Sequence, residues 1–460
     1  MITNKLQSIS HQTKKDFQSG FKWNLWGSTI FETLRVGHNL LLAYFLDPAL
    51  YGLIGTLFAT TYLAVRIADG GIAYTIHPYF QLFTKNERSF KKLLFTYFLL
   101  PLIPTLIGAL SVFYFFTRHQ IPTQNYGIYF FIFFILIISE TVRSFFRQFL
   151  HVAFKSKPTI KIEFILFISY LAIVWVPYFC FNKSLTLMTI FLPFLIDSII
   201  AILFFSILIK KIYTELPNNN NNETEIPPKL WGRLLSTRFF DFMLRLSRDL
   251  FTTNILTPLF ALKFGLKEAG VFYLISTIAI AIQTIIRTTV GHPGNALLAA
   301  IKEHTPQAKK DAFVLLSSKL SNLLFPSLFL IIISYKFFEK ITINYHINSS
   351  IILFAYVYSI MILSDLFFVL YESFYILEEK VAPICLIKLV EFCIFYGIIM
   401  SKQQISPLLI VSMLLIIRCL SFLSIGFYAF YRWQLVPSIN IRFKSLGVCT
   451  SLALLITFFW

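Results

Sequence analysis

The chain has 460 residues, of which 57% are hydrophobic, 18% aromatic and only 13% charged, and its formal net charge is +18. A soluble domain carries about a quarter charged residues, and a mean hydropathy of +0.72 over the whole length requires apolar surface facing lipid along most of the chain. The composition excludes a soluble enzyme, a disulfide-rich secreted scaffold and a disordered protein, and it predicts an all-α polytopic membrane protein.

The N-terminal end is polar and basic. Residues 1–22, MITNKLQSISHQTKKDFQSGFK, lack the apolar core of a secretory signal. We therefore expect the first span to act as its own insertion signal and residues 1–22 to form a cytoplasmic segment.

Apolar runs of about twenty residues, the length that crosses a hydrocarbon core, predict twelve transmembrane helices. Those in the first half are residues 23–46, 49–78, 92–116, 126–149, 160–181 and 185–209. Those in the second half are residues 232–260, 268–291, 312–335, 348–372, 380–401 and 404–431. A thirteenth apolar run, residues 447–460, is too short to cross a core about 30 Å thick, and whether it spans the membrane stays open.

Lysine and arginine gather on alternate loops, such as the one around Lys155 and Lys157, whereas the intervening loops are short and poor in charge. This bias predicts a cytoplasmic N-terminus. The asparagine run and the high Phe, Ile and Lys content are typical of an AT-rich genome, and we expect a bacterial inner-membrane location. The positive charge is then mostly a topology signal with added affinity for anionic membrane lipids. Nucleic-acid binding would need a basic soluble face, which this composition does not offer.

A polar segment divides the chain. Residues 210–230 contain five consecutive asparagines flanked by prolines and predict a flexible cytoplasmic linker. The predicted domains are an N-terminal six-helix bundle at 23–209, a C-terminal six-helix bundle at 231–432, and a tail at 433–460 with the short apolar run.

The two halves echo each other in sequence. Leu25-Trp26-Gly27 opens the first half and Leu230-Trp231-Gly232 opens the second, and the LYGLIG of 50–55 corresponds to the EAGVFY of 268–273. An even number of spans in each half keeps both in the same orientation, so these matches predict a parallel repeat around a central cleft. That layout is typical of a transporter.

This organisation resembles the polysaccharide (O-antigen-type) flippases of the multidrug/oligosaccharidyl-lipid/polysaccharide (MOP) exporter superfamily. The segments that carry the resemblance are FLDPALYGL at 45–53, IADGGI at 67–72 and GLKEAGVF at 265–272. The resemblance implies two six-helix bundles in the V-shaped arrangement of MATE-like transporters. It also implies alternating access that flips undecaprenyl-diphosphate-linked oligosaccharides from the cytoplasmic to the outer leaflet, with H⁺ or Na⁺ coupling and with a polysaccharide polymerase and glycosyltransferases as partners.

Charged residues within the spans are expensive. Each costs roughly 2.5–3.5 kcal/mol at the bilayer centre unless it faces protein or water. In several spans an acid and a base lie one helical turn apart, which puts both on one helix face. These pairs are Glu32–Arg35, Arg66–Asp69, Glu140–Arg143, Asp241–Arg245 and Lys388–Glu391.

Two of these pairs, Glu140–Arg143 and Lys388–Glu391, are best interpreted as self-neutralising contacts that let their helices insert and hold the bundle together. Other acids have no base one turn away, and each is open to three interpretations: a protonated acid, a bridge across helices or a cation site. These acids are Glu163, Asp197, Asp365 and Glu372.

The resemblance places spans one, two, seven and eight around the central cavity, and bases outnumber acids there. Arginine suits a diphosphate because its planar fork donates two parallel hydrogen bonds to phosphate oxygens. The arginines predicted to bind the substrate are Arg35, Arg66, Arg245, Arg248 and Arg287. The acids predicted to pair charge or to couple transport to an ion are Glu32, Asp69, Asp241 and Asp249.

Two other classes of function compete with this hypothesis. A lipid II or multidrug exporter would share the fold, although a drug exporter favours an acidic or apolar cleft. A membrane polymerase or glycosyltransferase would place catalytic residues on a large loop, and no such loop, D-x-D motif or Walker A sequence is present in the sequence. The cysteines show no metal-ligand spacing, so we expect no metal site. Because no catalytic loop or motif is found in the sequence, we expect a protein that is not an enzyme and that uses no cofactor.

Overall fold

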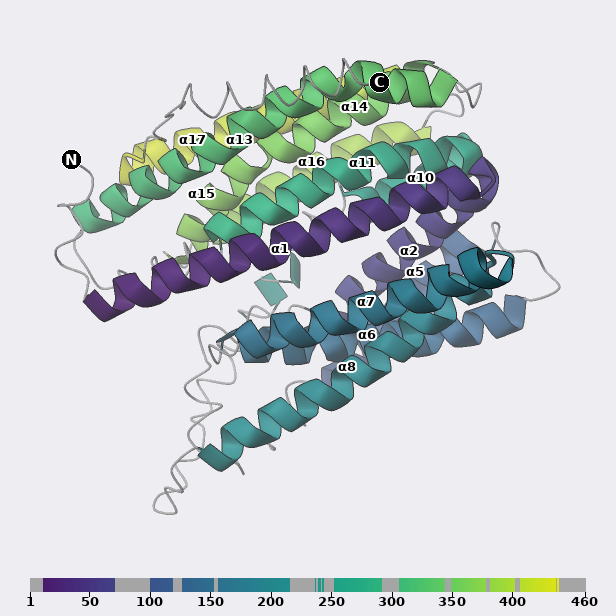
Figure 1. Cartoon of the computed structure of the whole chain (residues 1–460). Helices are drawn as coiled ribbons and strands as arrows, with labels where there is room; N and C mark the ends of the chain where they lie inside the picture. The colour runs from purple at the N-terminus through teal and green to yellow at the C-terminus, as the bar shows by residue number, and fades with distance from the viewer. Residues whose placement is uncertain are drawn as a thin grey trace. The chain divides into compact units, whose positions relative to one another are not determined.

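The computed structural model describes residues 11–70, 100–118, 126–152, 156–215, 252–291, 306–343, 349–377, 381–401 and 406–435, with isolated positions at 236–243 and at 437. In these residues all regular structure is helical (Figure 1). The helices of the first half are α1 (His11–Phe45), α2 (Pro48–Asp69), α5 (Leu100–Thr117), α6 (Tyr126–Val152), α7 (Ser156–Phe181) and α8 (Leu187–Glu215). Those of the second half are α10 (Thr253–Lys263), α11 (Leu266–Ile286), the π-helix η4 (Arg287–Gly291), α13 (Pro306–Ile343), α14 (Ser349–Ser364), α15 (Leu366–Leu377), α16 (Val381–Ser401) and α17 (Pro407–Trp433).

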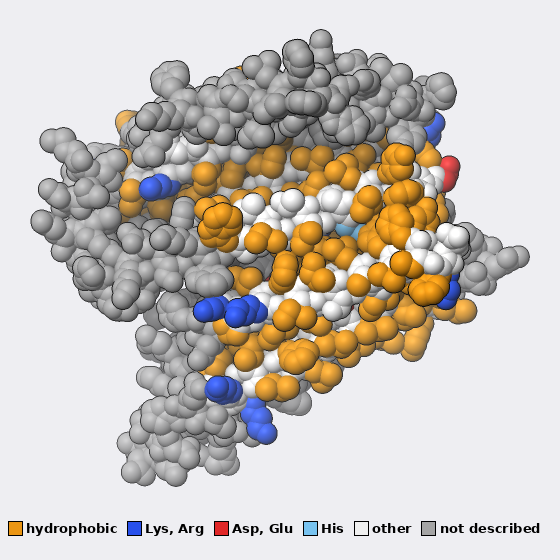
Figure 2. Space-filling view, viewed as in Figure 1, with side chains coloured by type: hydrophobic (Ala, Val, Ile, Leu, Met, Phe, Trp, Pro, Cys, Tyr) orange, Lys and Arg blue, Asp and Glu red, His pale blue; other side chains and the backbone are white. Residues whose placement is uncertain are grey.

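The apolar surface confirms a multi-pass membrane protein. Within the described residues, seven helices are long and apolar enough to cross a membrane, and two shorter apolar helices accompany them. Large apolar side chains are exposed along these helices, for example Ile165, Ile207 and Leu423. Figure 2 shows hydrophobic side chains filling a band on the face drawn, with Lys and Arg nearer the helix ends. Such a band is the surface that lipid tails solvate.

The described helices overlap all twelve runs predicted to span the membrane, but several extend beyond them, for example α13, which covers Pro306–Ile343 where 312–335 was predicted. Helix α1 begins at His11, inside the segment 1–22, and α8 continues to Glu215, inside the predicted linker. Helical hydrogen bonds extend past the apolar runs because Lys and Gln are good helix formers that need no burial. The rest of the linker and the apolar run 447–460 lie outside the described residues.

Three predicted spans are interrupted. Helix α2 ends at Asp69, and Gly70 then adopts φ 52°, a left-handed conformation that glycine adopts without steric cost. Thr252, within the predicted span 232–260, is extended at φ −90° and ψ 167° and forms the N-cap of α10. Asp365 lies in a turn that separates α14 from α15 within the predicted span 348–372. Hydropathy carries no information about such breaks, because apolar composition persists across them.

The predicted repeat has a structural counterpart in two helix hairpins. Leu46 and Asp47 join α1 to α2, and Phe264 and Gly265 join α10 to α11. Gly265 has φ +112°, and a Cβ built there would lie 3.0 Å from Oε2 of Glu268. The second turn therefore requires glycine.

The chain forms two compact units. Unit 1 comprises residues 1–48 and 270–460, and unit 2 comprises residues 49–269. The chain thus passes between the units inside both hairpins: α1 belongs to unit 1 with α13–α17, and α10 belongs to unit 2 with α5–α8. The sequence-based division into six and six spans stays a prediction.

Aromatic side chains pack the interior of each unit. In unit 2, Phe191 lies 4.5 Å from Phe58 and 4.7 Å from Phe133, which lies 5.0 Å from Phe113 (ring centroids), so one row of rings joins α2, α5, α6 and α8. Each such pair contributes about 0.5–1.5 kcal/mol beyond the apolar area it buries.

Unit 1 has a corresponding set of rings. Phe272 of α11 contacts Tyr358 of α14 at 5.1 Å, and Phe313 of α13 contacts Tyr371 and Phe374 of α15 at 5.2 Å and 5.0 Å (ring centroids). These contacts join α11 to α14 and α13 to α15.

Candidate substrate-binding site

The first candidate group lies on α1. Nη2 of Arg35 lies 2.6 Å from Oε2 of Glu32, so the predicted pair forms. The carboxylate is buried, whereas 31% of the Arg35 side chain stays exposed. Glu32 therefore orients the Arg35 guanidinium, of which Nε and Nη2 are buried, while part of the side chain stays exposed.

Arg35 belongs to a polar stripe on one side of α1. Buried Asn39 follows it by one turn, and buried His38 lies beside it. Within unit 1, α1 packs against η4, and Arg35 lies close enough to Tyr273 of α11 for an electrostatic interaction. The stripe thus faces the α11–η4 segment, and the element that carries Arg35 adjoins the element that begins with Arg287.

Arg287 occupies a local irregularity of the helix. It is the first residue of η4, the π-helix that follows α11. The Thr288 hydroxyl donates a hydrogen bond to the Thr284 carbonyl (2.9 Å), which competes with the regular backbone pattern. Single π-turns inside helices frequently occur at functional sites. The sequence predicted the arginine but not the π-helix.

Arg66 lies on the most buried of the candidate spans that the structure describes. From Tyr51 to the end of α2, only Tyr62, Arg66 and Ile67 are not buried. Arg66 is exposed in the last turn, where a cation interacts favourably with the helix dipole. Asp69 is the last residue of the helix and is buried.

The helical breaks fall in the same place in both halves. Regular helix ends at Asp69 in α2 and at Ile286 in α11, and these positions follow the equivalent glycines Gly52 and Gly270 by about the same number of residues. Arg66 and Arg287 both adjoin these ends. The predicted site residues Arg245, Arg248, Asp241 and Asp249 lie outside the described residues.

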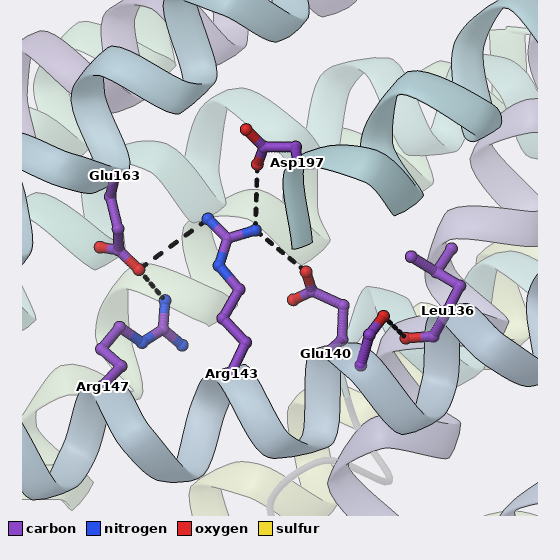
Figure 3. A network of polar contacts seen from close by, with 7 residues as sticks. Leu136, Glu140, Arg143, Arg147, Glu163 and Asp197 are labelled. Atoms are coloured by element: carbon purple, nitrogen blue, oxygen red, sulfur yellow. Dashed lines mark hydrogen bonds and ion pairs between the residues drawn. The ribbon is translucent and has the colours of Figure 1, made fainter. Parts of the chain in front are cut away.

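A second type of charged site lies inside unit 2 (Figure 3). Nη1 of Arg143 on α6 lies 3.0 Å from Oε1 of Glu140 and 3.1 Å from Oδ2 of Asp197 on α8. Oε1 of Glu163 on α7 lies 4.0 Å from Nη2 of Arg143 and 3.3 Å from Nη1 of Arg147. These five residues, the α6–α8 network, join three helices.

Unit 1 contains a comparable cluster. Oε2 of Glu391 on α16 lies 3.7 Å from Nζ of Lys388 and 3.6 Å from Nη1 of Arg418 on α17. Nη2 of Arg418 lies 3.5 Å from Oδ2 of Asp365, in the turn between α14 and α15. These four residues, the α15–α17 network, occupy spans ten to twelve, the counterparts of the spans that hold the α6–α8 network.

The networks settle several of the open assignments. Both predicted i,i+3 pairs, Glu140–Arg143 and Lys388–Glu391, are confirmed, and Glu163, Asp197 and Asp365 form bridges across helices. The sequence did not predict that Arg418 is a partner of two acids, because contacts between helices leave no periodic signal. Arg147 could have been found, since it lies one turn after Arg143.

Comparisons with known proteins support the fold. The sequence matches no protein-family model and no curated protein. A solved structure described as the outward-facing conformation of a multidrug resistance MATE family transporter of the MOP superfamily is similar, with a TM-score of 0.52 and 10% sequence identity. The similarity covers 92% of this chain and 96% of that one. At this identity the likeness establishes the fold alone, which is the MATE-like helical fold that the resemblance implied.

Proposed function

We propose that this protein is a membrane transporter that flips undecaprenyl-diphosphate-linked oligosaccharides from the cytoplasmic to the outer leaflet by alternating access. The observation that carries the proposal is the exposure of Arg66 in the last turn of α2, where from Tyr51 onward only Tyr62, Arg66 and Ile67 are not buried. An anionic group can reach the exposed surface of this cation. The MATE-like fold supplies the two-unit framework that alternating access requires.

Arginine side chains are well suited to bind a diphosphate. A diphosphate carries several oxygens that each accept charge-assisted hydrogen bonds, and an arginine fork donates two of them at once. In this proposal Arg35, Arg66 and Arg287 bind the diphosphate, and Arg245 and Arg248 add positive charge. Glu32 holds the Arg35 fork in place at 2.6 Å between substrates and yields part of its contact when the diphosphate binds.

The remaining elements of the proposal follow from the sequence. The protein resides in a bacterial inner membrane with its N-terminus in the cytoplasm, and H⁺ or Na⁺ flux drives the cycle through acids such as Asp69. A polymerase and glycosyltransferases would consume and supply the lipid-linked sugar. The protein acts as a transporter rather than as an enzyme.

Multidrug export is the second candidate, because the similar solved structure is a multidrug resistance transporter. A drug exporter binds organic cations, and the accessible arginines of this site repel them. Lipid II export is a variant of the leading proposal, since lipid II carries the same diphosphate.

The test measures leaflet translocation in proteoliposomes. The probe is a fluorescent undecaprenyl-diphosphate tetrasaccharide, and ethidium uptake is measured in parallel. We expect the intact chain to translocate the lipid, Arg35→Ala and Arg66→Ala to reduce its rate at least tenfold, and the matched control Lys210→Ala, at an exposed lysine, to leave it unchanged. Ethidium transport without lipid translocation would contradict the proposal and favour drug export.

A further inference from the structure

One aromatic side chain on α2 is exposed although nearly all of its helix is buried. Tyr62 keeps 38% of its surface accessible. Its neighbours Leu63, Ala64 and Val65 are all buried. A tyrosine that packed only against protein would be covered as they are, so its exposure calls for an explanation.

Tyr62 and Arg66 share one face of α2. They are four residues apart, the spacing that places side chains one above the other on a helix, and both are exposed. An arginine that faced acyl chains here would be costly. The exposed side of Arg66 therefore needs a polar group or water beside it.

Two phenylalanine rings pack beside the Tyr62 ring. Its centroid lies 6.4 Å from Phe58, in a stacked arrangement, and 6.5 Å from Phe194 of α8, edge-on. The phenol also lies close enough to Arg143 of the α6–α8 network for an electrostatic interaction. Contacts of this kind limit ring rotation and so prepare the exposed surface for a ligand at little entropic cost.

We infer that the Tyr62 ring stacks against the first sugar of the lipid-linked oligosaccharide, the one attached directly to the diphosphate. This inference rests on the proposed function. Cβ atoms at i and i+4 on a helix lie about 5–6 Å apart, and the first sugar adjoins the diphosphate by one bond. A diphosphate bound by Arg66 thus places that sugar beside Tyr62.

The chemistry of the two partners is complementary. The face of an aromatic ring is apolar and carries the negative part of its quadrupole, and one face of a pyranose presents a set of weakly positive C–H bonds. Their contact needs the ring and not the hydroxyl. Tyr62 would therefore distinguish a sugar-bearing lipid from a bare lipid diphosphate, which Arg66 binds alone.

The experiment compares two probes on the full-length protein in nanodiscs: undecaprenyl diphosphate bearing a disaccharide, and undecaprenyl diphosphate without sugar. We expect Tyr62→Ala to weaken binding of the disaccharide lipid about tenfold, while binding of the sugar-free lipid changes less than about twofold. Tyr62→Phe and Tyr62→Trp retain the ring and should bind both probes as the intact chain does. Tyr44→Ala, at an exposed tyrosine of α1, is the matched control and should change neither affinity.

Three other outcomes would contradict the proposed function or the stacking inference. If the intact chain binds neither probe above the level of phosphatidylglycerol, the proposed function and the stacking inference both fail. If the intact chain binds both and Tyr62→Ala weakens both equally or neither, the stacking inference fails while the proposed function stands. A loss of affinity in Tyr62→Phe equal to that in Tyr62→Ala would replace ring stacking with hydroxyl bonding.

Discussion

Arg143, on the one hand, and Arg35 and Arg66, on the other, differ in their surroundings within the described spans. Arg143 is 9% exposed and lies within 4.0 Å of carboxylate oxygens from Glu140, Glu163 and Asp197. Arg35 contacts one carboxylate and is 31% exposed, and Arg66 is exposed on a buried helix. Arg143 is thus surrounded by several acids, whereas Arg35 and Arg66 lie outside both networks and keep part of their surface exposed.

The difference indicates which charges support the fold and which are available to a ligand. A guanidinium surrounded by acids from three helices is neutralised by the protein itself and has little to offer a substrate. An anion can reach a guanidinium that keeps part of its surface exposed. We therefore assign the α6–α8 and α15–α17 networks to the fold, and we propose Arg35 and Arg66, which lie outside these networks, for binding.

The largest expected effect comes from removing Arg143. Arg143→Ala leaves three acids close together without their shared base, and loss of one member of a buried ion pair costs about 3–5 kcal/mol. We expect the thermal unfolding midpoint of the detergent-solubilised protein to fall sharply, whereas Arg66→Ala should leave it almost unchanged. Equal midpoints for the two variants would remove the distinction between the two groups.

Arg418→Ala should have the next largest effect. Its contacts with Asp365 and Glu391, at 3.5 Å and 3.6 Å, are longer than those of Arg143, and Lys388 still neutralises Glu391. We expect a loss of about 3 kcal/mol in the free energy of unfolding. Adding Glu391→Gln to this variant should restore part of the loss, and a double-mutant cycle measures the coupling. Strictly additive losses would show that the two side chains do not interact.

Arg66→Lys tests the accessible group. Lysine keeps the positive charge but has no planar fork, so it cannot donate two parallel hydrogen bonds to one phosphate. We expect the initial rate of lipid translocation in proteoliposomes to fall about tenfold, equivalent to about 1.4 kcal/mol, with an unchanged unfolding midpoint. A lysine variant as fast as the intact chain would reduce the role of Arg66 to that of a point charge.

Arg147→Ala should have the smallest effect. Arg147 is 40% exposed and meets Glu163 at 3.3 Å, and exposed ion pairs contribute at most about 1 kcal/mol. We expect the unfolding midpoint to shift by a few degrees at most. A shift as large as that of Arg143→Ala would mean that the α6–α8 network depends on both arginines.

The sequence predicted the membrane class, the helical runs and the pairs within one helix, because each leaves a local signal. Apolar runs give the spans, and spacings of three residues gave Glu32–Arg35 and Glu140–Arg143. Bridges such as Arg143–Asp197 join residues that are 54 positions apart. Their formation depends on how α6 packs against α8, which no single stretch of sequence records.

The breaks in the helices and the exposure of single side chains were not predicted either, because both depend on packing between helices. The π-helix at Arg287 and the extended Thr252 lie in segments whose composition favours a continuous helix. Tyr62 is one of 22 tyrosines, and nothing in its local sequence marks it as exposed. Only the packing of α2 against its neighbours shows that Tyr62 and Arg66 remain uncovered.

The most direct test of the central claim measures binding and folding in the same sample. Purified intact chain and Arg66→Ala are titrated in nanodiscs with the undecaprenyl-diphosphate disaccharide, and the unfolding midpoint of each is recorded. We predict an affinity at least tenfold weaker for Arg66→Ala, with a midpoint within about 2 °C of that of the intact chain. An unchanged affinity, or a loss of affinity accompanied by a collapsed midpoint, would contradict the assignment of Arg66 to binding.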